Sequence, residues 1–508
     1  MGQTTIVLML ITILSKILGF VRESVMAAYI GAGELKSIYT TATTIPTLFI
    51  NVVVIGISSG FIPSYNKVLN EKGREKADDF TSNLINVNIL IGLIFFFIVF
   101  VFSKQISKIL SPDLFGTSLD LASDFTKISI IGVFAFVYSS IIKGYLNIYG
   151  NFIDPVVTGL ILNVFVIIST IISAKLGNPY ILIIGTLLGN VIQYIRFPFA
   201  SKKLGFKYSK ILDFKDEYIR YILLLSFPIM ISTAADSISL IIDNSMASAF
   251  FGVSSVSKIF YAKSMLNFIL TVVTISITTV SFPSIAKAGQ SNNLNEMKSL
   301  IYSSNIYAAL LVVPATFGMM ALSHPIIRLA FERNAFTASD TAVVSALLFS
   351  YGPYIIFSSI IKIFQNGFYS VGDAKTPLFT VVILQILNVI FNIIFSRIFG
   401  LKGLAYATSL STGLGSLLLI WMFRKKFGTF ENRNGIKTII KIIIGSLLTS
   451  IIAIIIYSKI IFSFSLVITL GITVGVSAMF YLYIMRILNI AEFDYLISVV
   501  RDKFKRKK

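Results

Sequence analysis

The chain has 508 residues, of which 56% are hydrophobic and 13% are charged, with a formal net charge of +20 and a mean hydropathy of +0.86. A soluble protein of this composition would expose large apolar patches to water, so the sequence predicts a membrane protein. Cysteine is absent and His324 is the one histidine, which excludes disulfides, thiol catalysis and a zinc site built on two or more histidines.

Apolar runs such as 89–102, 222–232, 380–395 and 442–457 recur between short polar breaks. With their flanks they approach the ~20 residues that a helix needs to cross a bilayer, and they lack the ~10-residue alternation of transmembrane strands. The sequence therefore predicts an all-α polytopic membrane protein with about 14 transmembrane helices. Their centres are expected near residues 18, 50, 92, 132, 163, 187, 230, 268, 310, 354, 387, 412, 448 and 474.

Basic residues outside these spans gather in four segments, which follow the second, sixth and twelfth spans and form the tail: 67–76, 196–220, 424–441 and 501–508. The loops on the opposite side carry fewer cations, and Lys36 is expected among them. Because cytoplasmic loops are enriched in lysine and arginine, both termini are expected to be cytoplasmic. Topology and attraction to anionic membrane lipids then account for the net charge, so nucleic acid is not an expected partner.

An internal repeat divides the chain. The sequence SSIIK at 139–143 recurs at 358–362, Pro63 pairs with Pro283, and Gly31 pairs with Gly252, all at a spacing close to 220 residues. Six helices fit in that spacing, and a unit with an even number of spans repeats in the same orientation. We therefore expect two six-helix lobes related by a parallel pseudo-two-fold axis, followed by two extra C-terminal helices. The predicted boundaries are 1–215, 216–425 and 426–508, the last including the basic tail.

Several segments carry a family resemblance. LSKILGFVRE at 14–23 and YIGAG at 29–33 resemble the amino-terminal signature of the MurJ (MviN) lipid II flippases, and 331–341, 367–377 and 403–409 resemble later segments of the same family. This resemblance implies the fold of the MOP flippase superfamily, with a central cavity and a lipid-tail groove at the two extra helices. It also implies a bacterial cytoplasmic membrane protein, used in peptidoglycan synthesis, that moves a polyprenyl-linked precursor.

The chain departs from the family pattern at several charged positions. It has lysine at 16 where the family typically has arginine, Ser37 in place of an aspartate, and Ile50 and Asn51 in place of an arginine pair. In the second lobe, Lys263 and Ser264 replace an aspartate–arginine pair. Lipid II is the expected cargo, and another undecaprenyl-pyrophosphate saccharide for capsule or wall polymer is the alternative.

Cations inside the predicted spans are the candidate substrate-binding residues. A charge at the centre of a membrane helix costs at least ~2.5 to 3.5 kcal/mol, so a cation retained there favours a function. Arg22, Lys16 and Lys263 are these candidates, because a guanidinium fork or an ammonium suits the phosphate oxygens of an anionic cargo. The alternative is that Arg22 pairs with Glu23 or extends to a headgroup.

Other charged residues are weaker candidates. Lys143 and Lys362 occupy equivalent repeat positions, where headgroup contact is expected. Asp236 and Asp243 are candidate ion-coupling residues, although a simple interhelical hydrogen bond is the favoured explanation.

The expected mechanism is alternating access without covalent chemistry. No catalytic residue, metal or cofactor is expected, and the chain lacks a nucleotide-binding Gly-x-x-x-x-Gly-Lys-Ser/Thr loop. Membrane potential, sodium and protons all remain open as driving forces, and the cell-wall synthesis machinery is a candidate partner. A drug antiporter of the same superfamily is the more distant alternative, since its cavity would favour acidic residues.

Overall fold

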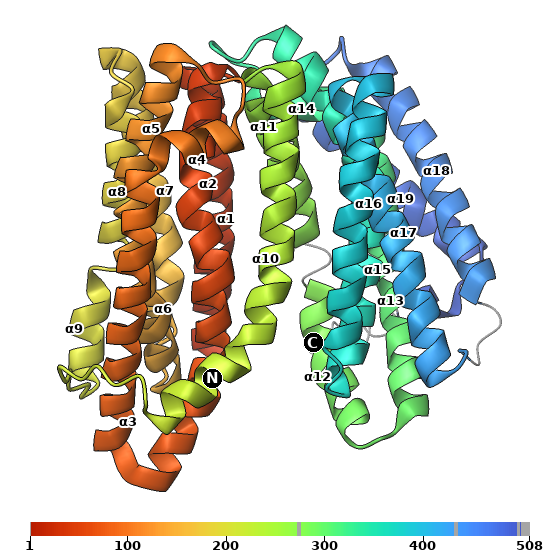
Figure 1. Ribbon diagram of the computed structural model, residues 1–508. Coiled ribbons are helices and arrows are strands. Elements are labelled where there is room, and N and C mark those ends of the chain that lie inside the picture. Colours follow the sequence, from red (N-terminus) through yellow and green to blue (C-terminus); the bar gives the residue numbers. More distant parts are fainter. Residues whose placement is uncertain (1, 272–275, 431–434, 495–497, 499–508) are drawn as a thin grey trace. The chain divides into compact units, whose positions relative to one another are not determined.

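The structure is a computed structural model that describes residues 2–271, 276–430, 435–494 and 498. The side chains of a few residues within these ranges, Asp236 among them, lie outside the described part. Every regular element in the described ranges is helical (Figure 1), which confirms the predicted all-α class. The chain forms two compact units: unit 1 contains 1–257 and 331–337, and unit 2 contains 258–330 and 338–508.

Unit 1 is built from ten helices and one π-helical segment. Their bounds are α1 Gly2–Ile30, α2 Glu34–Phe49, η1 Ile50–Val54, α3 Ile55–Val101, α4 Ser103–Leu110, α5 Gly116–Ile130, α6 Val133–Ile148, α7 Ile153–Leu176, α8 Tyr180–Ile192, α9 Arg196–Lys203 and α10 Glu217–Phe251. α3 would be roughly 70 Å long if it were straight, which is more than twice the hydrocarbon thickness. It turns at Gly73, whose φ of 82° is open to glycine. α3 therefore has two arms.

In the described ranges unit 2 contains nine helices, of which α11 begins and α14 ends at the boundary with unit 1. Their bounds are α11 Ser254–Leu270, α12 Ser276–Gln290, α13 Leu294–Ala321, α14 Ser323–Phe331, α15 Ala338–Ser370, α16 Lys375–Phe399, α17 Leu401–Phe427, α18 Gly435–Ile460 and α19 Leu466–Ile487. The two C-terminal helices pack on α13, where Tyr481 and Met485 join Ile306 and Leu310 in one buried cluster. The Tyr481 hydroxyl donates to the carbonyl of Leu310 at 2.9 Å.

Ten helical segments in the described ranges are long and apolar enough to cross a membrane. They are Glu34–Val101, Gly116–Ile148, Ile153–Leu176, Tyr180–Lys203, Leu294–Ala321, Ala338–Ser370, Lys375–Phe399, Leu401–Phe427, Gly435–Ile460 and Leu466–Ile487. The protein is therefore a multi-pass membrane protein. The count of fourteen spans, the boundaries at 215 and 425, and the pseudo-two-fold axis stay predictions.

The glycines paired by the repeat both follow a helix and both have a positive φ. Gly31 follows α1 with a φ of 77°, and Gly252 follows α10 with a φ of 84°. A left-handed residue after a helix lets its amide satisfy a carbonyl of the last turn. Gly31 N accordingly donates to Ala27 O at 2.9 Å, and Gly252 N donates to Ser248 O at 3.0 Å. Each glycine thus donates to a carbonyl in the last turn of the helix before it.

Candidate functional site

A buried charge cluster forms in unit 1 where α1 and α2 meet. α1 ends at Ile30, and the turn from Gly31 to Gly33 leads directly into α2. Lys36 lies in the first turn of α2 and reaches back to Glu23 on α1, with 3.1 Å between Lys36 Nζ and Glu23 Oε2. The turn therefore joins charges thirteen positions apart in the sequence.

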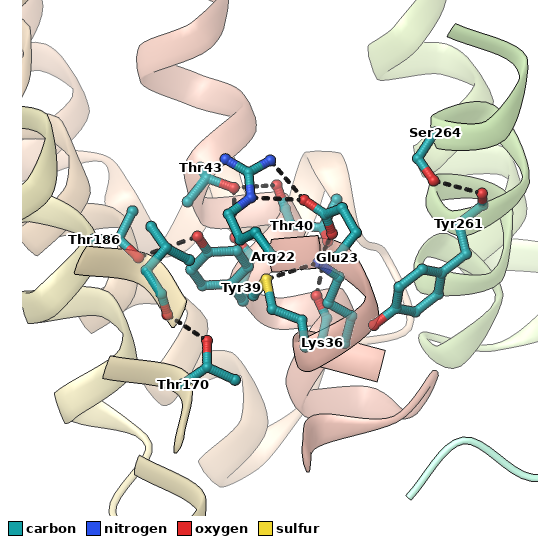
Figure 2. A network of polar contacts seen from close by, with 12 residues as sticks. Arg22, Glu23, Lys36, Tyr39, Thr40, Thr43, Thr170, Thr186, Tyr261 and Ser264 are labelled. Atoms are coloured by element: carbon teal, nitrogen blue, oxygen red, sulfur yellow. Dashed lines mark hydrogen bonds and ion pairs between the residues drawn. The ribbon is translucent and has the colours of Figure 1, made fainter. Parts of the chain in front are cut away.

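Arg22 completes the cluster from the same helix as Glu23 (Figure 2). Its Nε and Nη2 donate to Glu23 Oε1 at 3.0 and 2.6 Å. The Glu23 carboxylate thus accepts from Arg22 on one oxygen and from Lys36 on the other. The expected alternative, in which Arg22 pairs with Glu23, is confirmed as a contact.

Asn163 on α7 fixes the other side of the guanidinium. Its Oδ1 accepts from Arg22 Nη1 at 3.1 Å, and its Nδ2 donates to the carbonyl of Ser15 on α1 at 3.1 Å. The amide therefore ties α7 to α1 while holding Arg22 in place. Asn163 could not be identified from the sequence, because 141 residues separate it from Arg22.

The hydrogen bonds leave a defined part of Arg22 open. A guanidinium has five N–H groups in a rigid fork. Nε, Nη2 and Nη1 each use one N–H within the cluster, so one N–H on each terminal nitrogen remains. The Arg22 side chain is 27% exposed, whereas Lys36 is fully buried. Two N–H groups on neighbouring nitrogens match the spacing of two oxygens of a carboxylate or phosphate.

Two cations share one carboxylate in this cluster, so its formal charge is +1. Lys36 also lies 5.3 Å from the ring centre of Tyr39, whose hydroxyl is 3.1 Å from the hydroxyl oxygen of Thr186 on α8. A buried cluster with a surplus positive charge favours an anion over a cation. The expectation that Lys36 lies in a loop was wrong, because it is the third residue of α2 and is packed inside the unit.

The remaining candidates of unit 1 are spread over three helices. Lys16 is exposed on α1, and Lys143 is exposed on α6. Asp243 on α10 is buried, with 1% of its surface exposed. Asp236 is also on α10, but its side chain lies outside the described part. Neither Lys16 nor Lys143 has a hydrogen bond or ion pair to Arg22 among the described residues.

Unit 2 holds the other two candidate lysines. Lys263 on α11 is half-buried, and its ammonium lies 5.5 Å from the ring centre of Tyr351 on α15. Lys362 on α15 is also half-buried. The roles assigned to the seven candidate residues stay predictions.

The described residues hold no group of three or more histidine, cysteine, aspartate or glutamate side chains that could bind a metal ion. Amide and hydroxyl groups do gather between α16 and α17. Asn388 Nδ2 donates to Thr408 Oγ1 at 3.3 Å, and Asn392 Nδ2 donates to Asn388 Oδ1 at 3.2 Å. The first of these contacts joins the two helices, and the second lies within α16.

Comparison with known proteins shows the family of this chain. The family model described as "Lipid II flippase MurJ" matches residues 26–475. The chain belongs to the MurJ family. MurJ proteins are membrane transporters rather than enzymes.

Curated MurJ relatives are similar along nearly the whole chain. A probable lipid II flippase MurJ of Rickettsia prowazekii is 26% identical over 503 residues, covering 96% of this chain and 98% of its own. Another, from Buchnera aphidicola subsp. Baizongia pistaciae, is 27% identical over 452 residues and covers 88% of both chains.

Solved structures are also similar to this chain over most of its length. A lipid II flippase MurJ in an inward closed conformation matches with a TM-score of 0.80 and 26% identity, over 95% of this chain and 99% of its own. An inward-facing multidrug resistance MATE transporter of the MOP superfamily matches with a TM-score of 0.68 at 15% identity, covering 81% of this chain and 94% of its own. The second likeness shows the fold alone.

Proposed function

We propose that this protein is a flippase that carries lipid II from the inner to the outer leaflet of the bacterial cytoplasmic membrane by alternating access. Its place in the MurJ family is the observation that carries this proposal. The charge cluster of unit 1 supports it, because lipid II presents a pyrophosphate and the cluster presents a guanidinium with two N–H groups left open.

In this proposal Arg22 donates its open pair of N–H groups to the pyrophosphate. Glu23 and Asn163 hold the guanidinium plane, so little side-chain entropy is lost when the cargo binds. Lys263 and Lys16 are the further cations proposed to bind the cargo. Lys143 and Lys362 contact headgroups of anionic lipids.

The membrane potential can drive export without nucleotide hydrolysis. Moving one charge through 100 mV is worth ~2.3 kcal/mol, so export of two net negative charges gains ~4.6 kcal/mol when the inside is negative. Asp236 and Asp243 are the residues that would bind sodium or protons if an ion gradient also drives export. We further propose that both termini are cytoplasmic and that the cell-wall synthesis machinery receives the exported precursor.

Replacement of Arg22 tests the proposal in cells depleted of their own flippase. Arg22→Ala is expected to abolish growth and to stop labelled precursor from reaching the outer leaflet. Arg22→Lys is expected to retain part of the activity, because it keeps the charge and loses the paired donors. Lys459→Ala is the control, since Lys459 is an exposed lysine at the end of α18.

Growth and outer-leaflet precursor at wild-type levels in Arg22→Ala, with wild-type amounts of protein in the membrane, would contradict the role of Arg22. Failure of the wild-type chain to replace the depleted flippase would contradict the function itself.

A second cargo is favoured by one observation. Ile50 and Asn51, in the π-helical segment, stand where the MurJ family typically has arginines, so this chain holds fewer cations for the pyrophosphate sugar. A flippase for another undecaprenyl-pyrophosphate saccharide would fit that change. Replacement of a capsule or wall-polymer flippase by this chain, without replacement of the lipid II flippase, would decide for it. A drug antiporter fits poorly, because the surplus charge of the cluster is positive.

A further inference from the structure

A pocket of about 300 Å³ lies in unit 2 where α13 begins and where the chain continues beyond α17 and α19. α13 contributes one face, and Phe430 and Glu492 contribute the others. The lining residues are Asn295, Lys298, Ser299, Tyr302, Ser303, Phe430 and Glu492. The volume is at the lower end of the range of small-molecule sites, about 300 to 1,000 Å³, so it suits a group of headgroup size.

The walls of this pocket are anchored in the core of the unit. The Phe430 ring stacks on Phe423 with 5.7 Å between ring centres, and Phe423 is fully buried. The Tyr302 hydroxyl donates to Glu492 Oε1 at 3.4 Å. A Cβ added to Gly435, where α18 begins, would lie 2.6 Å from Tyr302 Cε2. The pocket is thus bounded by side chains that are held in place.

Opposite charges line the pocket without neutralising each other. Lys298 and Glu492 come from different walls, and no ion pair within 4.0 Å joins them. In the described ranges Lys298 has no hydrogen bond to another side chain, and Tyr302 is the contact of Glu492. Because an uncompensated charge is more stable with a partner, a ligand with both a negative and a positive group would satisfy both walls.

The end of α17, which precedes Phe430, has residues typical of a membrane interface. Trp421, near the end of α17, is 57% exposed, and Lys425 Nζ lies 5.3 Å from its ring centre. Arg424, Lys425 and Lys426 follow in the last turn. Tryptophan and lysine gather at the depth of lipid headgroups. Because Phe430 lies three residues after α17, we expect this part of the pocket near a level rich in phosphate and amine groups.

We propose that this pocket binds an amine-bearing phosphate ester, with the phosphate at Lys298 and the hydroxyls of Ser299 and Ser303, and the ammonium at Glu492 beside the Tyr302 and Phe430 rings. A carboxylate and aromatic faces both attract an ammonium, and an ammonium with hydroxyl donors attracts a phosphate. The headgroup of an ethanolamine phospholipid has this chemistry, and so does water-soluble glycerophosphoethanolamine.

Binding to the purified, delipidated full-length protein tests this site. The probes are short-chain phosphatidylethanolamine, short-chain phosphatidylglycerol and glycerophosphoethanolamine, each titrated against the protein with native mass spectrometry to count bound molecules. One saturable site is expected that prefers phosphatidylethanolamine to phosphatidylglycerol. Binding of glycerophosphoethanolamine as tight as that of the lipid assigns the pocket to a water-soluble ligand, and binding of the lipid alone assigns it to a headgroup.

Two variants separate the two charges. Lys298→Ala is expected to weaken the binding of both phospholipids by about tenfold or more, because a hydrogen bond to a charged group is lost. Glu492→Gln is expected to weaken phosphatidylethanolamine by a similar factor and to leave phosphatidylglycerol unchanged. Lys425→Ala is the control, because Lys425 is an exposed lysine in the last turn of α17 and does not line the pocket. Absence of a saturable site, or binding unchanged in both variants at an unchanged melting temperature, would overturn the proposal.

Discussion

Replacement of Lys36 by methionine tests how much the buried ion pair between Lys36 and Glu23 stabilises unit 1. Lys36 is fully buried, and the Glu23 side chain beside it is 8% exposed. Methionine keeps most of the length of the side chain and removes its charge, so Glu23 keeps Arg22 and loses a partner on Oε2. Breaking a buried ion pair from one side costs about 3 to 5 kcal/mol, and the lower end is expected here because Arg22 remains.

A double-mutant cycle separates the pair from other effects of the substitution. Glu23→Gln combined with Lys36→Met removes both charges, so its loss of stability is expected to be smaller than the sum of the single losses, with a coupling of about 0.5 to 3 kcal/mol. Free energies of unfolding would be measured on the purified protein in mixed micelles by titration with a denaturing detergent.

Lys104→Met is the matched control for this cycle. Lys104 pairs with Asp120 where both side chains are more than half exposed, so its loss is expected to stay within about 1 kcal/mol. The account of the cluster would be wrong if Lys36→Met cost no more than this control. It would also be wrong if the two single losses at Glu23 and Lys36 simply added.

Three further predictions address other parts of the molecule. Gly31→Ala is expected to destabilise the protein by about 1 kcal/mol or more, because φ is 77° and the new Cβ would lie 2.6 Å from a backbone oxygen. Gly33→Ala is the control, because a Cβ at Gly33 meets nothing within 4 Å. Equal melting temperatures of the two variants would contradict the reasoning. A reporter fused after Lys508 is expected to read cytoplasmic and one near Ser111 external, and the reverse result would break the proposed topology. Lys263→Arg is expected to support growth and Lys263→Glu to fail in flippase-depleted cells, and growth with the glutamate variant would remove Lys263 from the proposed cargo site.

The helical class could be predicted from the sequence because a bilayer demands long apolar helices, and the apolar runs are visible without any knowledge of packing. The contact between Arg22 and Glu23 could also be anticipated, since the residues are adjacent. The matching ends at Gly31 and Gly252 followed from the repeat. Each of these features depends on local sequence or on a sequence pattern that recurs after about 220 residues.

Lys36 could not be placed from the sequence, because burial depends on the direction in which α2 leaves the turn after Gly31. A positive residue close to a span end reads as a loop cation under the positive-inside rule, and only its partner Glu23 on the preceding helix explains its burial. Asn163 was missed for a related reason, since asparagines are common in helices and its contacts with α1 are long-range. The pocket between Lys298 and Glu492 joins residues 194 positions apart, which no local pattern reveals.

Transport by the purified protein is the most direct test of the central claim. The chain would be reconstituted into liposomes that carry fluorescent lipid II in both leaflets, and the fraction reached by an added quencher would be followed before and after a membrane potential is imposed. The account predicts that the potential shifts lipid II toward the positive side in liposomes with the wild-type chain, and that Arg22→Ala liposomes behave like protein-free ones. Equal redistribution with wild-type protein, Arg22→Ala protein and no protein would contradict it.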